Sequence, residues 1–243
     1  CPLVIPIKIA LISQEGKLLC ERLHILKEDQ DSLAFNDLPT NISPPVLSLF
    51  RGFSAPVTWN SDLNDHELIT LIKFDNDHFA RWDACQLLMK KAITSRSRLC
   101  PQNDLENLLI HSLQEVMENH DMQDSNFISK LISIPGLSEL EFSQKDVDPI
   151  SLYESWIKFQ SLIGARCKER LYKLIELNKS MSLDQWPRGQ GSRNIIGIAW
   201  RYISVARDIS IRSILLDAVK GDSMSLARFA LEAFNLVDCE ESK

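Results

Sequence analysis

The first sixty residues alternate apolar and polar side chains with the period of two that is typical of β-strands. The clearest stretch is Leu3–Ile12, whose odd-numbered positions from Leu3 to Leu11 are all apolar. A complete sandwich has about seven strands, and this segment offers only four or five short ones. Residues 1–60 are therefore predicted to form a partial Ig-like β-sandwich. The predicted strands are Leu3–Ile12, Leu18–Leu26, a short strand at Leu33 and Phe35, Val46–Phe53, and Val57–Trp59.

From Asp62 onward the apolar residues recur every three or four positions, which is the period of an amphipathic helix. Asn64 or Asp65 is a predicted helix cap, and Asp148 before Pro149 predicts another helix start. Residues 61–243 are predicted to form an α-helical domain of stacked helix pairs, a bundle or superhelix. The fold class is thus mainly α with a small β portion. The predicted helical stretches include Leu68–Ile72, Phe79–Ile93, Leu105–Val116, Asn126–Ile132, Leu137–Phe142, Leu152–Ile163, Leu171–Leu177, Ile195–Ala206, Ile211–Val219 and Ser225–Leu236.

Composition narrows the class of protein. The 243 residues are 44% hydrophobic and 25% charged, which argues against disorder. Only 8 are glycine, which disfavours a turn-rich all-β fold or a glycine-built nucleotide site. The formal net charge of −6 predicts no nucleic-acid partner. No apolar run approaches the roughly 18 residues of a membrane helix, so no membrane partner is predicted.

Cysteine spacing and the first residues bear on cellular location. Six cysteines stand at positions 1, 20, 85, 100, 167 and 239, and none forms a C-x-x-C pair. This spacing predicts reduced thiols in a cytoplasmic protein. The opening stretch lacks the basic start of a signal peptide. A chain that begins with Cys1 at a predicted strand suggests a segment of a longer chain; a terminus left by tag cleavage is the alternative.

His66 and Glu67 resemble the start of the zinc-protease pattern H-E-x-x-H. In that pattern two histidines four residues apart on one helix bind the same zinc ion. Thr70 stands where the second histidine is required, so we interpret the pair as an exposed helix start. The other histidines lack a second histidine at ligand spacing and are predicted to be surface or satisfied, partly buried residues: His24, His78, His111 and His120.

Two further patterns are weak candidates. Gly189-x-Gly191-x-x-Asn194, after Trp186-Pro187-Arg188, resembles a nucleotide-binding G-x-G-x-x-G. Asn194 replaces the third glycine and no buried strand precedes the motif, so a flexible loop leading into a helix is predicted, with Ser192 as a possible cap. A basic cluster favours a solvated helix end over an anion site. It consists of Lys90, Lys91, Arg96 and Arg98.

Arg51 is the most informative single charge, because it lies inside an apolar run. We predict that it pairs with a carboxylate across the junction between the β and helical parts. A functional role is the alternative. Taken alone, the residues show no catalytic constellation.

One sequence run is similar to a known family. Pro45–Val57 reads P-V-L-S-L-F-R-G-F-S-A-P-V and closely resembles a stretch of the aminopeptidase N family, the alanyl aminopeptidases. Further stretches resemble family motifs in the same order, from residue 2 to about residue 231. They are Pro2–Ile7 with Gly16-Lys17, Asp77–Ala84, Ile134–Leu140, Val147–Pro149, Arg193-Asn194, Ser223–Ser225 and Ala230-Leu231.

The resemblance implies a zinc metallopeptidase that removes N-terminal residues from peptides. It also implies a family architecture in which a β domain and a catalytic domain precede a small sandwich and a C-terminal helical superhelix. The family's H-E-x-x-H, distal glutamate and G-A-M-E-N motifs are absent from this sequence. The resemblance therefore places the chain after the catalytic domain and carries over no catalytic, cofactor-binding or metal-binding residue.

The function implied is that of a non-catalytic C-terminal portion of a zinc aminopeptidase. Zinc belongs to the parent catalytic domain and not to this segment. The implied partners are peptide substrates, reached through the parent enzyme, and the catalytic domain itself. The alternative is a free-standing helical scaffold that descends from the family and binds a partner protein.

Overall fold

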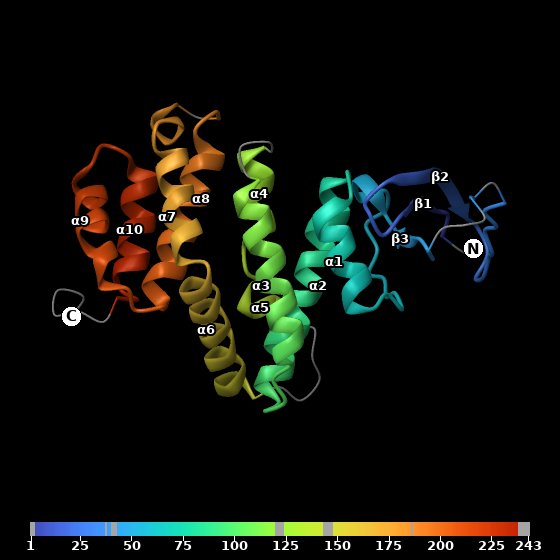
Figure 1. Cartoon of the computed structure of the whole chain (residues 1–243), viewed down its shortest axis with the longest axis horizontal. Coiled ribbons are helices and arrows are strands. Elements are labelled where there is room, and N and C mark those ends of the chain that lie inside the picture. The colour runs from blue at the N-terminus through green and yellow to red at the C-terminus, as the bar shows by residue number, and fades with distance from the viewer. Residues whose placement is uncertain are drawn as a thin grey trace. The chain divides into compact units, whose positions relative to one another are not determined.

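The structure, a computed structural model, describes residues 3–36, 38–39, 43–119, 124–142, 148–185 and 187–237 (Figure 1). Contacts divide the chain into two compact units, Cys1–Leu88 (unit 1) and Met89–Lys243 (unit 2). A small antiparallel sheet followed by helices confirms the predicted fold class. The predicted domain boundary between residues 60 and 61 stays a prediction.

Unit 1 begins with a three-stranded antiparallel sheet in the order β2-β1-β3. Its strands are β1 (Ile5–Ile12), β2 (Leu18–Leu26) and β3 (Val46–Ser48). Gly16 closes the turn between β1 and β2 with φ of 88°, a conformation that glycine adopts without steric cost. The last four residues of β1 are buried, so the core of the sheet lies at that end of the strand.

Three of the strand predictions after β2 are wrong. At Leu33 and Phe35 the described backbone forms no strand; the Ala34 carbonyl between them accepts a hydrogen bond from the Arg22 side chain at 3.3 Å. The predicted Val46–Phe53 strand stops at Ser48. A 3₁₀ turn, η1 (Arg51–Phe53), replaces its end.

The residues flanking η1 explain why the strand cannot continue. Phe50, Gly52 and Phe53 have φ of 52°, 62° and 55°, which is the left-handed region and not the extended one. The predicted Val57–Trp59 strand is also absent from the described backbone. There the Val57 amide donates to the Ala55 carbonyl at 3.0 Å, which is a local turn.

The first helices begin at the residues that the sequence indicates. Asn64 caps α1 (Asp65–Phe74) through a capping box in which Glu67 returns a bond to the Asn64 amide. The second helix, α2 (His78–Ser97), follows one short turn later, and Asp77 accepts from its Ala80 amide at 2.9 Å. Asp148 likewise caps α6 with Pro149 at the first helical position.

Unit 2 is built around one central helix. α8 contacts α4, α6, α7 and α10 (Figure 1), and most of its residues are buried. Tyr202 of α8 is almost completely buried and donates to the Ile132 carbonyl at 2.7 Å. The helices of this unit after α2 are α3 (Asn103–Glu118), α4 (Ser125–Leu131), α5 (Leu137–Phe142), α6 (Pro149–Arg166), α7 (Lys168–Lys179), α8 (Gln190–Val205), α9 (Arg212–Lys220) and α10 (Met224–Phe234), with short 3₁₀ turns η3 (Met181–Leu183) and η4 (Ile209–Ile211).

The predicted role of Ser192 is wrong. α8 begins at Gln190 after Gly189, without a side-chain cap, so Ser192 lies inside the first turn. Its hydroxyl is buried and has no hydrogen-bond partner among the described residues. Helix α8 starts earlier than the apolar pattern indicates, and Gly191 in its first turn lies close to the start of α4. A side chain there would come within 2.6 Å of the Asn126 backbone nitrogen.

The described helices include none with the length and apolar character needed to cross a membrane. The four described cysteines are free thiols. Burial raises the pKa of Cys85 to about 12 and that of Cys167 to about 11, so both thiols are protonated and unreactive at neutral pH. Cys1 and Cys239 lie outside the described residues, as do His120, Val147 and Trp186 of the sequence motifs.

Candidate functional site

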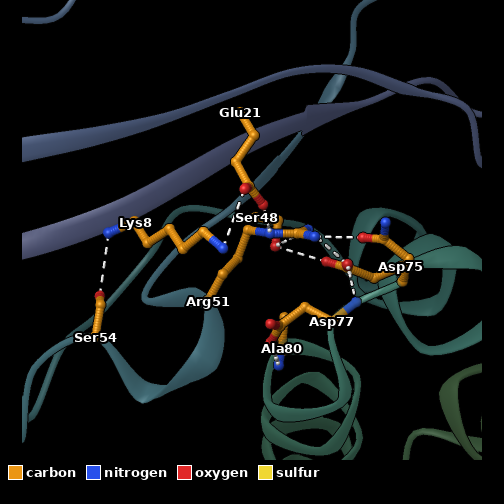
Figure 2. A network of polar contacts seen from close by, with 9 residues as sticks. Lys8, Glu21, Ser48, Arg51, Ser54, Asp75, Asp77 and Ala80 are labelled. Atoms are coloured by element: carbon orange, nitrogen blue, oxygen red, sulfur yellow. Dashed lines mark hydrogen bonds and ion pairs between the residues drawn. The ribbon is translucent and has the colours of Figure 1, made fainter.

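Arg51 lies at the centre of a buried polar network in unit 1 (Figure 2). Its side chain is 3% exposed, and its Nη1 donates to Asp75 Oδ1 at 2.6 Å. Because Asp75 ends α1 and Arg51 follows β3, this ion pair confirms the predicted carboxylate partner across the junction. The sequence pattern did not indicate which carboxylate this would be. We call Arg51, Asp75, Ser48, Glu21 and Asn76 the Arg51 junction.

The five residues of the Arg51 junction are linked to one another by hydrogen bonds. Arg51 Nε donates to Glu21 Oε2 at 2.9 Å, and its Nη2 donates to Asn76 Oδ1. The Ser48 hydroxyl donates to Asp75 Oδ2 at 2.6 Å, while Asp75 Oδ1 also accepts from the Asp77 amide at 2.8 Å. The Asp75 side chain is fully buried.

Because these polar atoms are already hydrogen-bonded to one another, few of them are available for other interactions. Both Asp75 oxygens already accept hydrogen bonds, and the buried guanidinium donates to two carboxylates. A salt bridge from Lys8 at 3.0 Å, which is the largest influence, lowers the pKa of Glu21, with Arg51 adding to the effect. The junction therefore holds the sheet to α1.

The His66 segment does not fit a zinc ion. His66 is exposed in the first turn of α1, and Glu67 is occupied by the capping box. Thr70, in the place of a second histidine, donates to the His66 carbonyl at 3.0 Å. The described residues contain no group of three His, Cys, Asp or Glu that could hold a metal ion. That the chain holds no metal or catalytic residue stays a prediction.

The other sequence candidates are placed as structural residues. Gly189 and Gly191 lie at the start of α8. Arg193, in its first turn, donates to the Ser182 and Asp184 carbonyls at 2.9 and 2.7 Å. Two of the four residues of the basic cluster at the end of α2 pair with carboxylates. Arg96 makes two bonds to buried Glu106, at 3.1 and 2.6 Å, and Lys90 pairs with Glu139 at 2.5 Å.

An open groove of about 510 Å³ lies on unit 1 beside the sheet. Its histidine, His24, is partly buried and pairs with Asp31, Nε2 to Oδ2, at 2.9 Å. A histidine held by a carboxylate is half of a nucleophile-activating set. The lining residues supply no serine, threonine, cysteine or lysine to complete it: Ile7, Ile9, His24, Leu26, Asp29, Gln30, Asp31, Leu33, Leu49 and Phe50.

Sequence reasoning missed a polar anchor in unit 2. Asp208 accepts from Lys168 Nζ at 2.7 Å, from the Tyr172 hydroxyl at 3.2 Å and from the Ser210 hydroxyl at 2.7 Å. The helical spacing of Lys168 and Tyr172 on α7 was the available signal. Burial alone would raise the pKa of Asp208, but the hydrogen bonds from Lys168 and Ser210 outweigh it and lower the pKa to about 2.

The Asp208 anchor gives a pH-dependent prediction. An ordinary aspartate titrates near 3.9, so the anchor stabilises unit 2 above about pH 4 and loses this effect as the pH falls towards 2. The half-exposed Lys168 is screened by water, so Asp208→Asn should lower the free energy of unfolding by only about 1 kcal/mol at pH 6.

Urea unfolding at pH 6 and pH 2.5, monitored by hydrogen exchange of unit 2 amides, measures the difference in the free energy of unfolding between the native chain and Asp208→Asn. The gap between the native chain and Asp208→Asn should narrow to about a third at the lower pH, because Asp208 is still partly ionised there. Asp217→Asn, at an exposed position on α9, is the control and should change little at either pH. A gap that persists unchanged at pH 2.5 would contradict the role of the anchor.

Two family models together match nearly the whole chain. Residues 65–243 match a domain of unknown function described as ARM repeats (DUF3458_C), and residues 1–62 match one described as an Ig-like fold (DUF3458). The chain belongs to the DUF3458 family. The two descriptions agree with the Ig-like and helical parts predicted from the sequence.

Curated relatives of this DUF3458 chain confirm the resemblance to aminopeptidase N. Aminopeptidase N of Caulobacter vibrioides is 28% identical over 186 residues, covering 75% of this chain and 21% of the relative. The Haemophilus influenzae aminopeptidase N is 27% identical, with 72% and 21% covered. The chain spans about a fifth of the length of these relatives. It corresponds to a C-terminal segment of an aminopeptidase N family enzyme.

A solved structure shows the same fold. Legionella pneumophila aminopeptidase A, crystallised in complex with aspartic acid, matches 98% of this chain and 29% of its own, with a TM-score of 0.84 and 21% sequence identity. At this level of identity the likeness concerns the fold.

Proposed function

We propose that this chain is the non-catalytic C-terminal portion of a zinc-dependent aminopeptidase that removes N-terminal amino acids from peptides. We call that longer protein the parent enzyme. In this proposal the chain packs against the catalytic domain and shapes or closes the substrate chamber, so that peptides enter and folded proteins do not. The parent enzyme is cytoplasmic, and its zinc lies in the catalytic domain.

One observation carries this proposal, namely the match of both the Ig-like and the helical part to a C-terminal segment of aminopeptidase N relatives. Three features of the chain support a non-catalytic role. The sequence contains no H-E-x-x-H, the His66 segment is committed to capping α1, and the Arg51 junction is saturated. When bound in the parent, zinc would polarise the attacking water, and this chain takes no part in that step.

Deleting residues 61–243 from the parent enzyme tests the chamber role. We expect the ratio of kcat/KM for a long peptide to that for a dipeptide to change about tenfold, equivalent to ~1.4 kcal/mol, since the helical part no longer limits access. Circular dichroism and zinc content check that the remaining protein folds. If the truncated enzyme kept the native kcat/KM on both long and short peptides, the proposal would be contradicted.

The isolated chain tests the non-catalytic role. We expect the purified 243-residue protein to bind no stoichiometric zinc and to release no product from an alanyl chromogenic substrate. Metal analysis after dialysis and a long incubation with substrate measure these two properties. Turnover by a pure sample would overturn this assignment, and its loss in His66→Ala would identify the segment responsible.

The ARM-repeat description of residues 65–243 also suits a second function, that of a free-standing helical scaffold that binds a partner protein. The gene's upstream reading frame distinguishes the two. An H-E-x-x-H in the same frame supports the enzyme, whereas a stop codon or an unrelated domain supports the scaffold.

A further inference from the structure

One arginine of unit 2 is held rigidly and still has unused donors. Arg201 on α8 lies over the ring of Trp156 on α6, with its Cζ 4.8 Å from the ring centroid. Its Nε donates to Gln160 Oε1 at 2.6 Å. A stacked and hydrogen-bonded guanidinium loses little further freedom when it binds a ligand, so this side chain is preorganised for recognition.

The groups that hold Arg201 are themselves fixed. The indole nitrogen of Trp156 donates to the Pro135 carbonyl at 2.9 Å, which sets the plane of the ring. Gln160 is fully buried, and its Nε2 donates to the Trp156 carbonyl at 3.3 Å. Because the amide nitrogen is used in this way, the amide oxygen is the atom presented to Arg201.

The far edge of the guanidinium is open. Within the described part of the chain, neither Nη1 nor Nη2 of Arg201 has a hydrogen-bond or ion-pair partner. Other cations of unit 2 do have carboxylate partners, such as Arg96 with Glu106 and Arg170 with Glu118. Arg201 is half-buried, and its planar fork matches the two oxygens of a carboxylate.

An exposed aromatic ring lies beside Trp156 on α6. The ring of Tyr153, which is 50% exposed, lies 6.3 Å from that of Trp156. Ile150, one turn earlier on α6, is 70% exposed. A ligand that combines one carboxylate with neighbouring apolar groups would match this surface, and a peptide has both. A single cation in a chain of net charge −6 suits one carboxylate better than a phosphate.

We propose that the Trp156–Arg201 pair binds a peptide carboxylate, with adjacent peptide side chains lying along Tyr153. This proposal rests on the proposed function, because the parent enzyme is what brings peptides to this chain. The carboxylate is either the C-terminus of the peptide or an acidic side chain within it. In both cases Nη1 and Nη2 of Arg201 would donate to the two carboxylate oxygens.

A titration of the isolated chain tests the proposal. The indole N–H resonance of Trp156, assigned by its absence from Trp156→Phe, is followed while tri-alanine or tri-alanine amide is added. We expect the free acid to bind about tenfold more tightly than the amide, a difference of ~1.4 kcal/mol. N-acetyl-Ala-Glu-Ala-amide tests the side-chain source. Its failure to bind would assign the site to the peptide C-terminus.

Arg201→Gln should abolish the preference for the free acid. Arg201→Lys should weaken it while keeping the charge, because an ammonium cannot form the planar double bond. Arg170→Gln, which removes an arginine already paired with Glu118, is the matched control and should leave the preference intact. Circular dichroism checks that each variant folds.

Equal affinity for acid and amide together with no binding of N-acetyl-Ala-Glu-Ala-amide would overturn the proposal, and so would a preference that survives Arg201→Gln. Inorganic phosphate that binds as tightly as tri-alanine would overturn the assignment to peptides. The titration reads no peptidase activity. A failure here therefore leaves the chamber role to its own test, the deletion of residues 61–243 from the parent enzyme.

Discussion

Replacing Arg51 by alanine should lower the free energy of unfolding of unit 1 by about 3–5 kcal/mol, the typical effect of removing one member of a buried ion pair. Asp75 would keep a fully buried carboxylate without its Arg51 partner, although the Ser48 hydroxyl and the Asp77 amide would still donate to it and the charge of Arg81 would still act on it. Hydrogen exchange of the β1 amides measures the loss in unit 1, and the amides of α8 provide an internal reference from unit 2.

A nearby surface pair provides the control for Arg51→Ala. Lys8 pairs with Glu21 at 3.0 Å, but the two side chains are 42% and 33% exposed, so Lys8→Ala should cost no more than about 1 kcal/mol. Removing both Arg51 and Asp75 should cost less than the sum of the two single changes, because neither member of the ion pair is left buried without the other. Equal effects of Arg51→Ala and Lys8→Ala would contradict the importance of burial.

Local patterns were sufficient where one dominant interaction fixes the backbone. The alternation in β1 and β2 places both strands correctly, and the caps at Asn64 and Asp148 identify the starts of α1 and α6. Each of these features depends on residues within a few positions of one another. The same pattern fails after Ser48, because left-handed conformations at Phe50 and Phe53 carry no signal in hydrophobic periodicity.

The candidate site, too, can be predicted from the sequence only where nearby residues determine it. The isolated charge of Arg51 in an apolar run predicts a buried partner, but the choice of Asp75 depends on how α1 ends against the sheet. Arg201 and Trp156 are 45 positions apart in the numbering and meet only because α6 packs on α8. No spacing rule connects them, so the sequence pattern does not predict that they meet.

Arg51 and Arg201 differ in whether carboxylates within the chain neutralise their charge. Arg51 is fully enclosed and its carboxylate partners are internal, so its binding capacity is used in holding the fold. Arg201 is oriented by an aromatic ring and an amide, neither of which neutralises its charge. An oriented and unneutralised guanidinium is the combination from which a ligand can gain affinity.

Replacing Gly164 by alanine should destabilise unit 2 by about 2–3 kcal/mol, in the range of an overpacked core. In a helix interior, alanine is normally favoured over glycine by about 1 kcal/mol, so the expected sign is the reverse of that given by helix propensity. The reason is the close approach of α6 to α8. A Cβ atom on Gly164 would lie 2.0 Å from the Tyr202 carbonyl oxygen and 2.7 Å from its carbonyl carbon.

Because this clash is with backbone atoms, no rotamer change of Tyr202 can relieve it, and one of the two helices must move. Gly136→Ala is the matched control: a Cβ there meets no atom within 4 Å, so the change should stay within about 0.5 kcal/mol of the native chain. Thermal unfolding distinguishes the two variants, since 1 kcal/mol corresponds to about 2–4 °C in a chain of this size.

A Gly164→Ala protein as stable as the native chain would mean that α6 and α8 do not pack this closely. The positions of Trp156 and Gln160 on α6 relative to Arg201 on α8 depend on the same helix contact, so that result would also weaken the geometry proposed for carboxylate binding.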